Sequence, residues 1–241
     1  MQYWGVTDPG CVRPQNQDAY RMEQLDKNAL LCVVCDGMGG AKSGNVASTM
    51  AVDAFTKEIM AAYKSGMSFE QMSALMLGAC KTANFAVYDQ AQQGEEYRGM
   101  GTTLVAALIQ GKCAAVINVG DSRAYRINRS GIRRVTTDHS VVELMIQRGK
   151  VTPDEARHYP GRNLITRAVG TEPGVQCDLF RLDLERGDCV LLCSDGLTNL
   201  VDDQEILFEV VHGANKQQCC QSLLKIAQNR GAPDNVTCVL A

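Results

Sequence analysis

Residues 30–40 read LLCVVCDGMGG, an apolar run that ends directly at Asp36 and Gly37. A short continuous apolar run that is closed by glycine is typical of a buried β-strand. An ionised carboxylate beside a core is costly unless it is paired or bound to a metal ion, which makes Asp36 a candidate functional residue. Glycine at position 37 allows the backbone to turn sharply and to present its own carbonyl as a ligand.

Three further aspartates occupy comparable places. Asp195 follows CVLLCS, Asp121 follows AAVINVG, and Asp234 lies in APDN immediately before VTCVL. Strand ends of one sheet face a common edge, so we expect these carboxylates to converge with Asp36. Mg²⁺ and Mn²⁺ would neutralise them, because both ions favour carboxylate, carbonyl and water oxygens. A single Asp-Gly pair is more often a simple turn, but the recurrence favours a shared metal site.

The polar segment RPQNQD begins at Arg13 and ends at Asp18. A guanidinium group matches phosphate oxygens bidentately, so an arginine beside an acid-rich metal site suits a phosphate ester. Taken alone, Arg13 is better explained as a solvated surface residue and Asp18 as a turn residue. Their functional interpretation therefore depends on the aspartates.

Composition limits the class of protein. The chain has 241 residues, 45% of them hydrophobic, and no linker-like stretch, so we expect a single domain over 1–241. A net charge of -3 provides no global basic field for nucleic acid. The start MQYWGVTDPG lacks a secretion signal and no apolar run is long enough to span a bilayer. We therefore expect a cytoplasmic protein with no nucleic-acid or membrane partner, and mostly buried, reduced cysteines.

Hydrophobic periodicity predicts a layered α/β (α+β) sandwich. Helices are expected in adjacent pairs rather than in alternation with strands, which favours sheets covered by helical layers over a doubly wound parallel sheet. Segment 140–165 has only short helical patterns and is expected to form a surface flap. The expected strands are 4–7, 29–35, 103–110, 114–119, 124–128, 189–193 and 236–240, and the expected helices are 45–63, 69–87, 203–211 and 216–228.

Other phosphate chemistries lack their motifs. No cysteine is followed by arginine at the Cys-x5-Arg spacing of a thiol phosphatase, and no Gly-x4-Gly-Lys-Ser/Thr loop is present. Cys32 and Cys35 form a lone Cys-x-x-Cys, but within a strand they point to opposite faces, and three histidines give little to complete a zinc site.

Short motifs are spread almost from end to end of the chain. They are RPQNQD (13–18), VCDGMGG (34–40), GTT (101–103), GDSRAY (120–125), DHS (138–140), ITRAVG (165–170), CSDGL (193–197) and PDNVT (233–237). In this order they resemble the PPM, or type 2C, metal-dependent protein serine/threonine phosphatases, and specifically their compact bacterial members.

The resemblance implies a four-layer sandwich of two antiparallel β-sheets flanked by helix pairs, with a flap at about 140–165. It implies hydrolysis of phosphoserine and phosphothreonine on proteins by a water activated at a binuclear Mn²⁺ or Mg²⁺ centre, without a phosphoenzyme, and two or three metal ions per chain. By the family pattern, Asp36 bridges the metals, the Gly37 carbonyl completes one, Asp195 and Asp234 bind the other, Asp121 helps to hold a third, Asp18 acts through water, Arg13 grips the phosphate and Asn235 supports Asp234.

One departure from the family pattern is visible. Many members carry a histidine just after the Asp-Gly pair, or in a His-x-x-Gly-Glu context, whereas residues 38–45 here contain neither histidine nor glutamate. General acid–base help contributes about 10² to 10⁴-fold, so its loss would slow turnover without removing the metal chemistry. His139 is a possible substitute but is better explained as structural, and His158 and His212 are weaker candidates.

Three functions compete at this point. The leading one is an active phosphatase that opposes a serine/threonine kinase and acts on phosphorylated proteins as a monomer. A catalytically weak or inactive sensor or binding module is the alternative, since the histidine and glutamate are missing. A metal-dependent phosphodiesterase or nuclease would need a basic groove that the composition does not supply.

Overall fold

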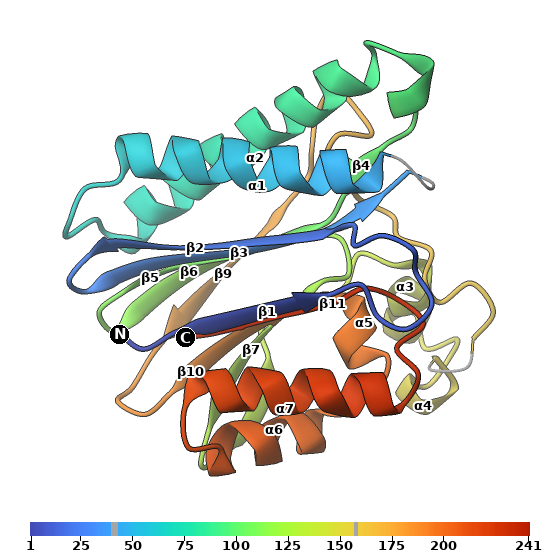
Figure 1. Cartoon of the computed structure of the whole chain (residues 1–241). Helices are drawn as coiled ribbons and strands as arrows, with labels where there is room; N and C mark the ends of the chain where they lie inside the picture. Colours follow the sequence, from blue (N-terminus) through green and yellow to red (C-terminus); the bar gives the residue numbers. More distant parts are fainter. Residues whose placement is uncertain (40–42, 157–158) are drawn as a thin grey trace.

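A computed structural model describes residues 1–39, 43–156 and 159–241. Two antiparallel sheets are stacked face to face, one helix pair covers the outer face of each, and the two ends of the chain lie close together (Figure 1). The predicted four-layer architecture is confirmed.

The first sheet has six strands in the order β2-β3-β5-β6-β9, with β4 paired to β3. All its pairings are antiparallel. Its strands are β2 (Asp18–Asp26), β3 (Ala29–Met38), β4 (Gly101–Thr102), β5 (Leu104–Gln110), β6 (Cys113–Val119) and β9 (Asp178–Asp183).

The second sheet has five strands in the order β1-β11-β10-β7-β8, and the first and last strands of the chain pair within it. Its strands are β1 (Trp4–Asp8), β7 (Arg123–Asn128), β8 (Gly131–Arg134), β10 (Cys189–Cys193) and β11 (Val236–Leu240).

Two helix pairs form the outer layers. Capping boxes begin α2 at Ser68 and α6 at Asp202, and in each the side chain accepts a hydrogen bond from a free amide of the first turn. The long helices are α1 (Gly44–Ala62), α2 (Phe69–Ala91), α6 (Asp203–His212) and α7 (Lys216–Asn229), and the short ones are η1 (Glu95–Tyr97), α3 (Val141–Gln147), α4 (Pro153–Ala156) and α5 (Asp195–Thr198).

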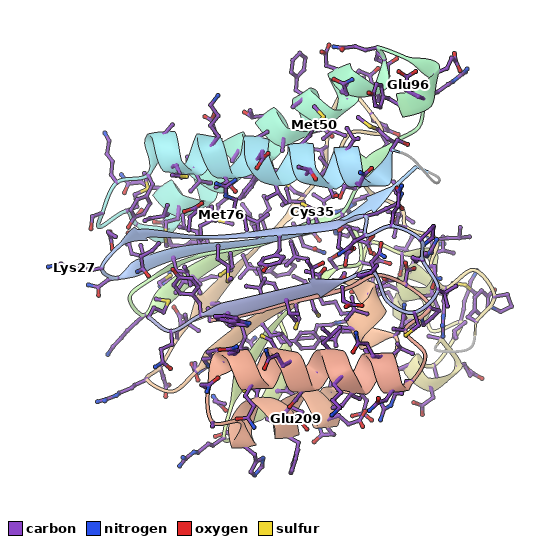
Figure 2. All side chains as sticks on the ribbon, viewed as in Figure 1. Lys27, Cys35, Met50, Met76, Glu96 and Glu209 are labelled. Atoms are coloured by element: carbon purple, nitrogen blue, oxygen red, sulfur yellow. The ribbon has the colours of Figure 1, made fainter. Side chains whose placement is uncertain are left out.

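Apolar side chains fill three layers. Strand β3 contributes to two of them, because Leu31, Val33 and Cys35 face α1 and α2 while alternate residues face the other sheet. Figure 2 shows Cys35 and Met76 in the layer between the six-stranded sheet and the helix pair α1 and α2, whereas Glu96 lies at the surface. The third layer lies between the second sheet and α6 and α7. Replacing a fully buried residue such as Leu31 with Ala would cost about 2–5 kcal/mol.

Sequence reasoning missed four strands, the two-residue β4 and three strands at sheet edges. β2, β8 and β9 are terminal strands of their sheets, and polar residues interrupt their apolar pattern. In β2, for example, Tyr20 and Met22 pack between the sheets, while Arg21 forms ion pairs with Glu23 and Asp53. The one-sided burial of such strands weakens the hydrophobic signal.

The segment that follows β8 contains α3 and α4 and returns to the body of the protein at an antiparallel bridge between Ser140 and Ile165. Ser140 caps α3 by accepting a hydrogen bond from Glu143. Both short helices lie in the segment for which the sequence shows short helical patterns. Residues 40–42 and His158, which were also named there, lie outside the described residues.

All eleven cysteines are free thiols, and most are buried. Cys32 and Cys35 face different core layers, as their spacing predicts. None of the described helices combines the length and apolar character needed to cross a membrane.

Candidate active site

A pocket of about 440 Å³ gathers the predicted site residues at one end of the sandwich. Arg13 reaches it from the loop between β1 and β2, and Asp36 from β3. Asp18, the first residue of β2, does not line the pocket and is 8% exposed. The other predicted residues that line it are Gly37, Asp121, Asp195, Asp234 and Asn235.

The sequence reasoning placed these acids at the strand ends of one sheet. The structure shows instead that they come from both sheets. Asp36 lies near the end of β3 in the six-stranded sheet, and Asp121 lies on the connection from β6 of that sheet to β7 of the other. Asp195 and Asp234 adjoin β10 and β11 of the five-stranded sheet. They meet because the two sheets are stacked with these ends on the same side. The pocket therefore spans the gap between the sheets.

Asp36-Gly37 is not a turn, which corrects the expectation from the sequence. Strand β3 continues through both residues, and Gly37 pairs with Thr102 of β4. A side chain at position 37 would collide with the Gly44 carbonyl at 2.0 Å. Glycine is thus required by the close approach of α1 to β3. Asp195 likewise is no turn residue, since it begins α5.

The Asp36 carboxyl lies at the centre of a group of mutually repelling acids. Burial raises its pKa well above the ordinary value, and repulsion from Asp18, Asp195, Asp121 and Asp234 adds to the effect. Asp36 is within hydrogen-bonding reach of both Asp18 and Asp195. The group therefore favours any partner, proton or cation, that removes negative charge.

The pKa values of Asp18 and Asp121 are also raised by burial and by repulsion between acids. Burial raises the pKa of Asp18 to about 6 and that of Asp121 to about 8, and in both cases Asp195 contributes repulsion. One Asp18 oxygen accepts a hydrogen bond of 2.7 Å from Ser194, while the other, Oδ1, is buried and receives no hydrogen bond from the residues that the structure describes. A buried carboxylate oxygen that accepts no hydrogen bond is unfavourable unless a water molecule or a cation contacts it.

Arg13 and Asp234 form an ion pair of 2.9 Å at the mouth of the pocket. The hydrogen bond to Asp234 raises the pKa of Arg13. Asn235 fixes the surrounding loop, because its side chain donates to the carbonyls of Pro9 and Gln15 at 2.9 and 3.0 Å and accepts from the amide of Gln17. Asn235 thereby places Asp234 and the arginine loop against each other.

The negative charge of the aspartates around Asp36 suits a divalent cation. Arg13 is paired with Asp234, and Arg123 with Asp138 at 2.6 Å, so that no basic side chain among the described residues forms an ion pair with Asp36 or Asp195. Hard oxygen ligands in this arrangement suit Mg²⁺ or Mn²⁺. Among the described residues, no three His, Cys, Asp or Glu side chains already stand as a group that could hold a metal ion. Arg13 contacts Oδ2 of Asp234 and the Asn235 amide donates to Oδ1, so a cation at Asp234 would share an oxygen with one of these donors.

Comparison with known proteins agrees with the site. The family model of protein phosphatase 2C matches residues 14–232. The chain belongs to the protein phosphatase 2C family. It is 33% identical to the serine/threonine phosphatase stp of Listeria welshimeri, over 97% of this chain and 92% of that protein. It is also 33% identical to the serine/threonine protein phosphatase PstP of Mycobacterium tuberculosis, over the whole of this chain and 45% of that protein.

Solved structures give the same result. The serine/threonine phosphatase Stp1 from Staphylococcus aureus superposes with a TM-score of 0.93 at 40% identity, over 99% of this chain and 93% of that one. The protein is therefore a metal-dependent serine/threonine phosphatase of the 2C type, a phosphoric monoester hydrolase, and its fold is that of the family.

In this 2C-type site, sequence reasoning gave no role to several residues that shape the pocket. Thr103 accepts a hydrogen bond from the Asp36 amide at 2.9 Å and contacts the Ser122 hydroxyl at 2.7 Å, so it fixes the backbone that carries the central acid. Asn163 and Ile165 form the wall on the flap side. The GTT motif was a signal for Thr103, but nothing in the sequence marks Asn163.

His139 of this phosphatase is a structural residue and does not line the pocket. Its Nδ1 accepts a hydrogen bond from the Gly120 amide, so the neutral ring carries its proton on Nε2, which lies 3.2 Å from Asp178. Burial lowers the pKa of His139. His212 contacts the Phe208 carbonyl at the end of α6 and is also absent from the pocket lining.

We expect His139→Ala to lower the free energy of unfolding by about 1–3 kcal/mol, because the Gly120 amide loses its acceptor. The lowered pKa adds a pH effect: the native ring binds a proton less readily than the unfolded one, so the contribution of His139 to stability falls as the pH drops below about 6.5, and the difference between wild type and variant becomes smaller. Urea unfolding at pH 7.5 and pH 5.5 measures both. Equal stability of variant and wild type at pH 7.5 would contradict this role.

Proposed function

We propose that the pocket around Asp36 hydrolyses phosphoserine and phosphothreonine in proteins by direct attack of water, without a phosphoenzyme. The observation that carries the proposal is a set of mutually repelling acids around Asp36, with Arg13 facing the same pocket. Acids of this kind attract divalent cations, and the arginine suits a phosphate group. Membership of a family of protein phosphatases supports the substrate class.

The proposed ligands follow from the chemistry of the donors. Two or three Mn²⁺ or Mg²⁺ ions per chain would, when bound, activate water and neutralise charge on the phosphoryl group. Asp36 and the Gly37 carbonyl would hold one ion, and Asp195 and Asp234 would share another with Asp36. We assign Asp121 to a third ion, and Asp18 to a supporting role through water, since Asp18 pairs with Asp36 across β2 and β3 but does not line the pocket.

Arg13 has two partners in this proposal. In the structure it is paired with Asp234, and it is half-exposed at the mouth of the pocket. When a phosphate enters, the guanidinium group exchanges the Asp234 carboxylate for phosphate oxygens, which frees Asp234 for a cation. Substrate binding and metal ligation are thus linked through one ion pair.

The leaving oxygen needs a proton. No histidine lines the pocket in the part of the chain that the structure describes. We infer that solvent supplies this proton, which predicts slow turnover relative to a site with a positioned general acid.

We propose that residues 1–241 form one catalytic domain with segment 140–165 as a flap beside the pocket. The substrates are phosphorylated proteins, and a serine/threonine kinase of the same cytoplasm would supply them. We propose a monomer without nucleic-acid or membrane partners.

Phosphate release from a phosphothreonine peptide tests the function. We expect release with Mn²⁺ or Mg²⁺ and none with excess chelator, because the metal-free acids repel a phosphate dianion. Restoration by added Mn²⁺ is the control for loss of folding. Peptide binding without release under both conditions would favour the sensor module instead.

Arg13→Ala should lower kcat/KM for the peptide by about 10- to 100-fold, since charged hydrogen bonds contribute about 1.5–3 kcal/mol. Most of the effect is expected in KM, as Arg13 contacts the phosphate rather than the leaving oxygen. Steady-state kinetics at saturating Mn²⁺ measure it, with exposed Arg186→Ala as the matched control. An unchanged KM would remove Arg13 from the phosphate site.

A further inference from the structure

A second pocket of about 610 Å³ adjoins the candidate active site. The two pockets share Met38 and Ile165 as lining residues. Most of the second pocket is formed by residues 165–176, the connection that leads to β9. A chain that leaves the catalytic pocket past Ile165 therefore enters this second pocket.

The connection is held firmly against the body of the protein. Val169 and Thr102 exchange two backbone hydrogen bonds of 2.8 and 3.0 Å. The buried Asn84 side chain of α2 accepts from the Gly170 amide at 2.8 Å and donates to the Glu172 carbonyl at 3.0 Å. The pocket is thus preformed, which lowers the entropic cost of binding.

The second pocket is lined by two charged side chains, Arg167 and Glu172, and they differ in their partners. Arg167 is neutralised by Asp178, which it contacts at 2.8 Å. Glu172 is exposed, lines the pocket, and its carboxylate makes no hydrogen bond or ion pair with any residue that the structure describes. The neighbouring wall is apolar, with Met38, Ile165 and Val175. Such a lining suits an extended peptide that carries a basic side chain.

We propose that this second pocket binds the residues that flank the phosphorylated residue of a protein substrate, and that Glu172 selects a lysine or arginine there. The proposal rests on the proposed function, because the phosphate must occupy the Asp36 pocket. An extended chain advances about 3.3–3.6 Å per residue, so a few flanking residues suffice to pass from one pocket to the other. Continuity of the pockets and the unpaired carboxylate make a phosphoprotein segment the occupant.

Kinetics on a peptide series test the proposal. Phosphothreonine peptides that are otherwise neutral carry one lysine, moved through the four positions on each side of the phosphothreonine, with matched peptides that carry glutamate. Hydrolysis of p-nitrophenyl phosphate by the same preparation reports on the catalytic pocket alone and normalises every rate. The variants are Glu172→Gln and Glu172→Lys, and Glu96→Gln on η1, whose side chain projects outward, is the control (Figure 2).

We expect wild-type protein to prefer lysine at one or two positions by about 3- to 5-fold in kcat/KM, mainly through KM, as an exposed ion pair contributes up to about 1 kcal/mol. Glu172→Gln removes the preference, Glu172→Lys reverses it towards glutamate, and Glu96→Gln retains it. If wild type and all three variants share the same lysine preference, or if wild type has none, the role of Glu172 in the second pocket is overturned, while the proposed phosphatase function still stands. Wild-type protein that hydrolyses neither peptide nor p-nitrophenyl phosphate with Mn²⁺ overturns the proposed function as well.

Discussion

Replacing Asp195 with Asn lowers kcat for a phosphothreonine peptide by about 10³-fold or more, because the metal ions that Asp195 would hold supply several kcal/mol of transition-state stabilisation. The amide is neutral and offers one oxygen where the carboxylate offers two. Asn199 donates to Asp195 at 3.0 Å and begins to orient the side chain before any ion is bound. Single-turnover and steady-state phosphate release at saturating Mn²⁺ measure the loss.

The Asp195→Asn result separates chemistry from folding. Burial raises the pKa of Asp195 and repulsion from Asp234 adds to the effect, so the neutral amide relieves strain in the metal-free protein. We therefore expect the variant to unfold at the same temperature as metal-free wild type or higher. Asp203→Asn, on the exposed start of α6, is the matched control and should retain full activity. Undiminished hydrolysis by Asp195→Asn would refute the metal site.

The central strands could be predicted because both of their faces are buried. In β3, residues of one parity pack against the helices and those of the other parity against the second sheet, so the sequence shows a continuous apolar run. The edge strands could not be predicted in the same way. β9, for instance, carries Arg181 and Asp183 in an exposed ion pair between its apolar positions.

The candidate acids could be found from the sequence because a carboxylate directly after an apolar strand needs a reason. Their arrangement could not. Whether Asp36 and Asp195 meet depends on how two sheets stack, which no local pattern specifies. Thr103 shows the same limit, since its contact with Asp36 joins residues 67 positions apart. Family resemblance supplied the assignment of roles, which local chemistry alone left open.

Metal-free protein should lose stability as the pH rises from about 6 to about 8. The pKa values of Asp18 and Asp121 are raised from 3.8 to about 6 and about 8, so the native state holds protons that the unfolded state releases. The contribution of these bound protons to stability is fully present below about pH 4, and it is lost as the pH rises through each raised pKa. A cation replaces the lost protons, so Mn²⁺ should stabilise the protein most at pH 8.

Thermal unfolding with chelator or with Mn²⁺ at pH 6 and pH 8 measures both effects. At 100 times its dissociation constant, Mn²⁺ contributes about 2.7 kcal/mol, or about 5–10 °C in Tm for a chain of this size. Asp121→Asn should flatten the fall in Tm of the metal-free protein between pH 6 and pH 8, whereas Asp203→Asn should not. A metal-free Tm that rises over this interval would mean that the acids are not crowded, and the electrostatic reason for a cation in this pocket would be lost.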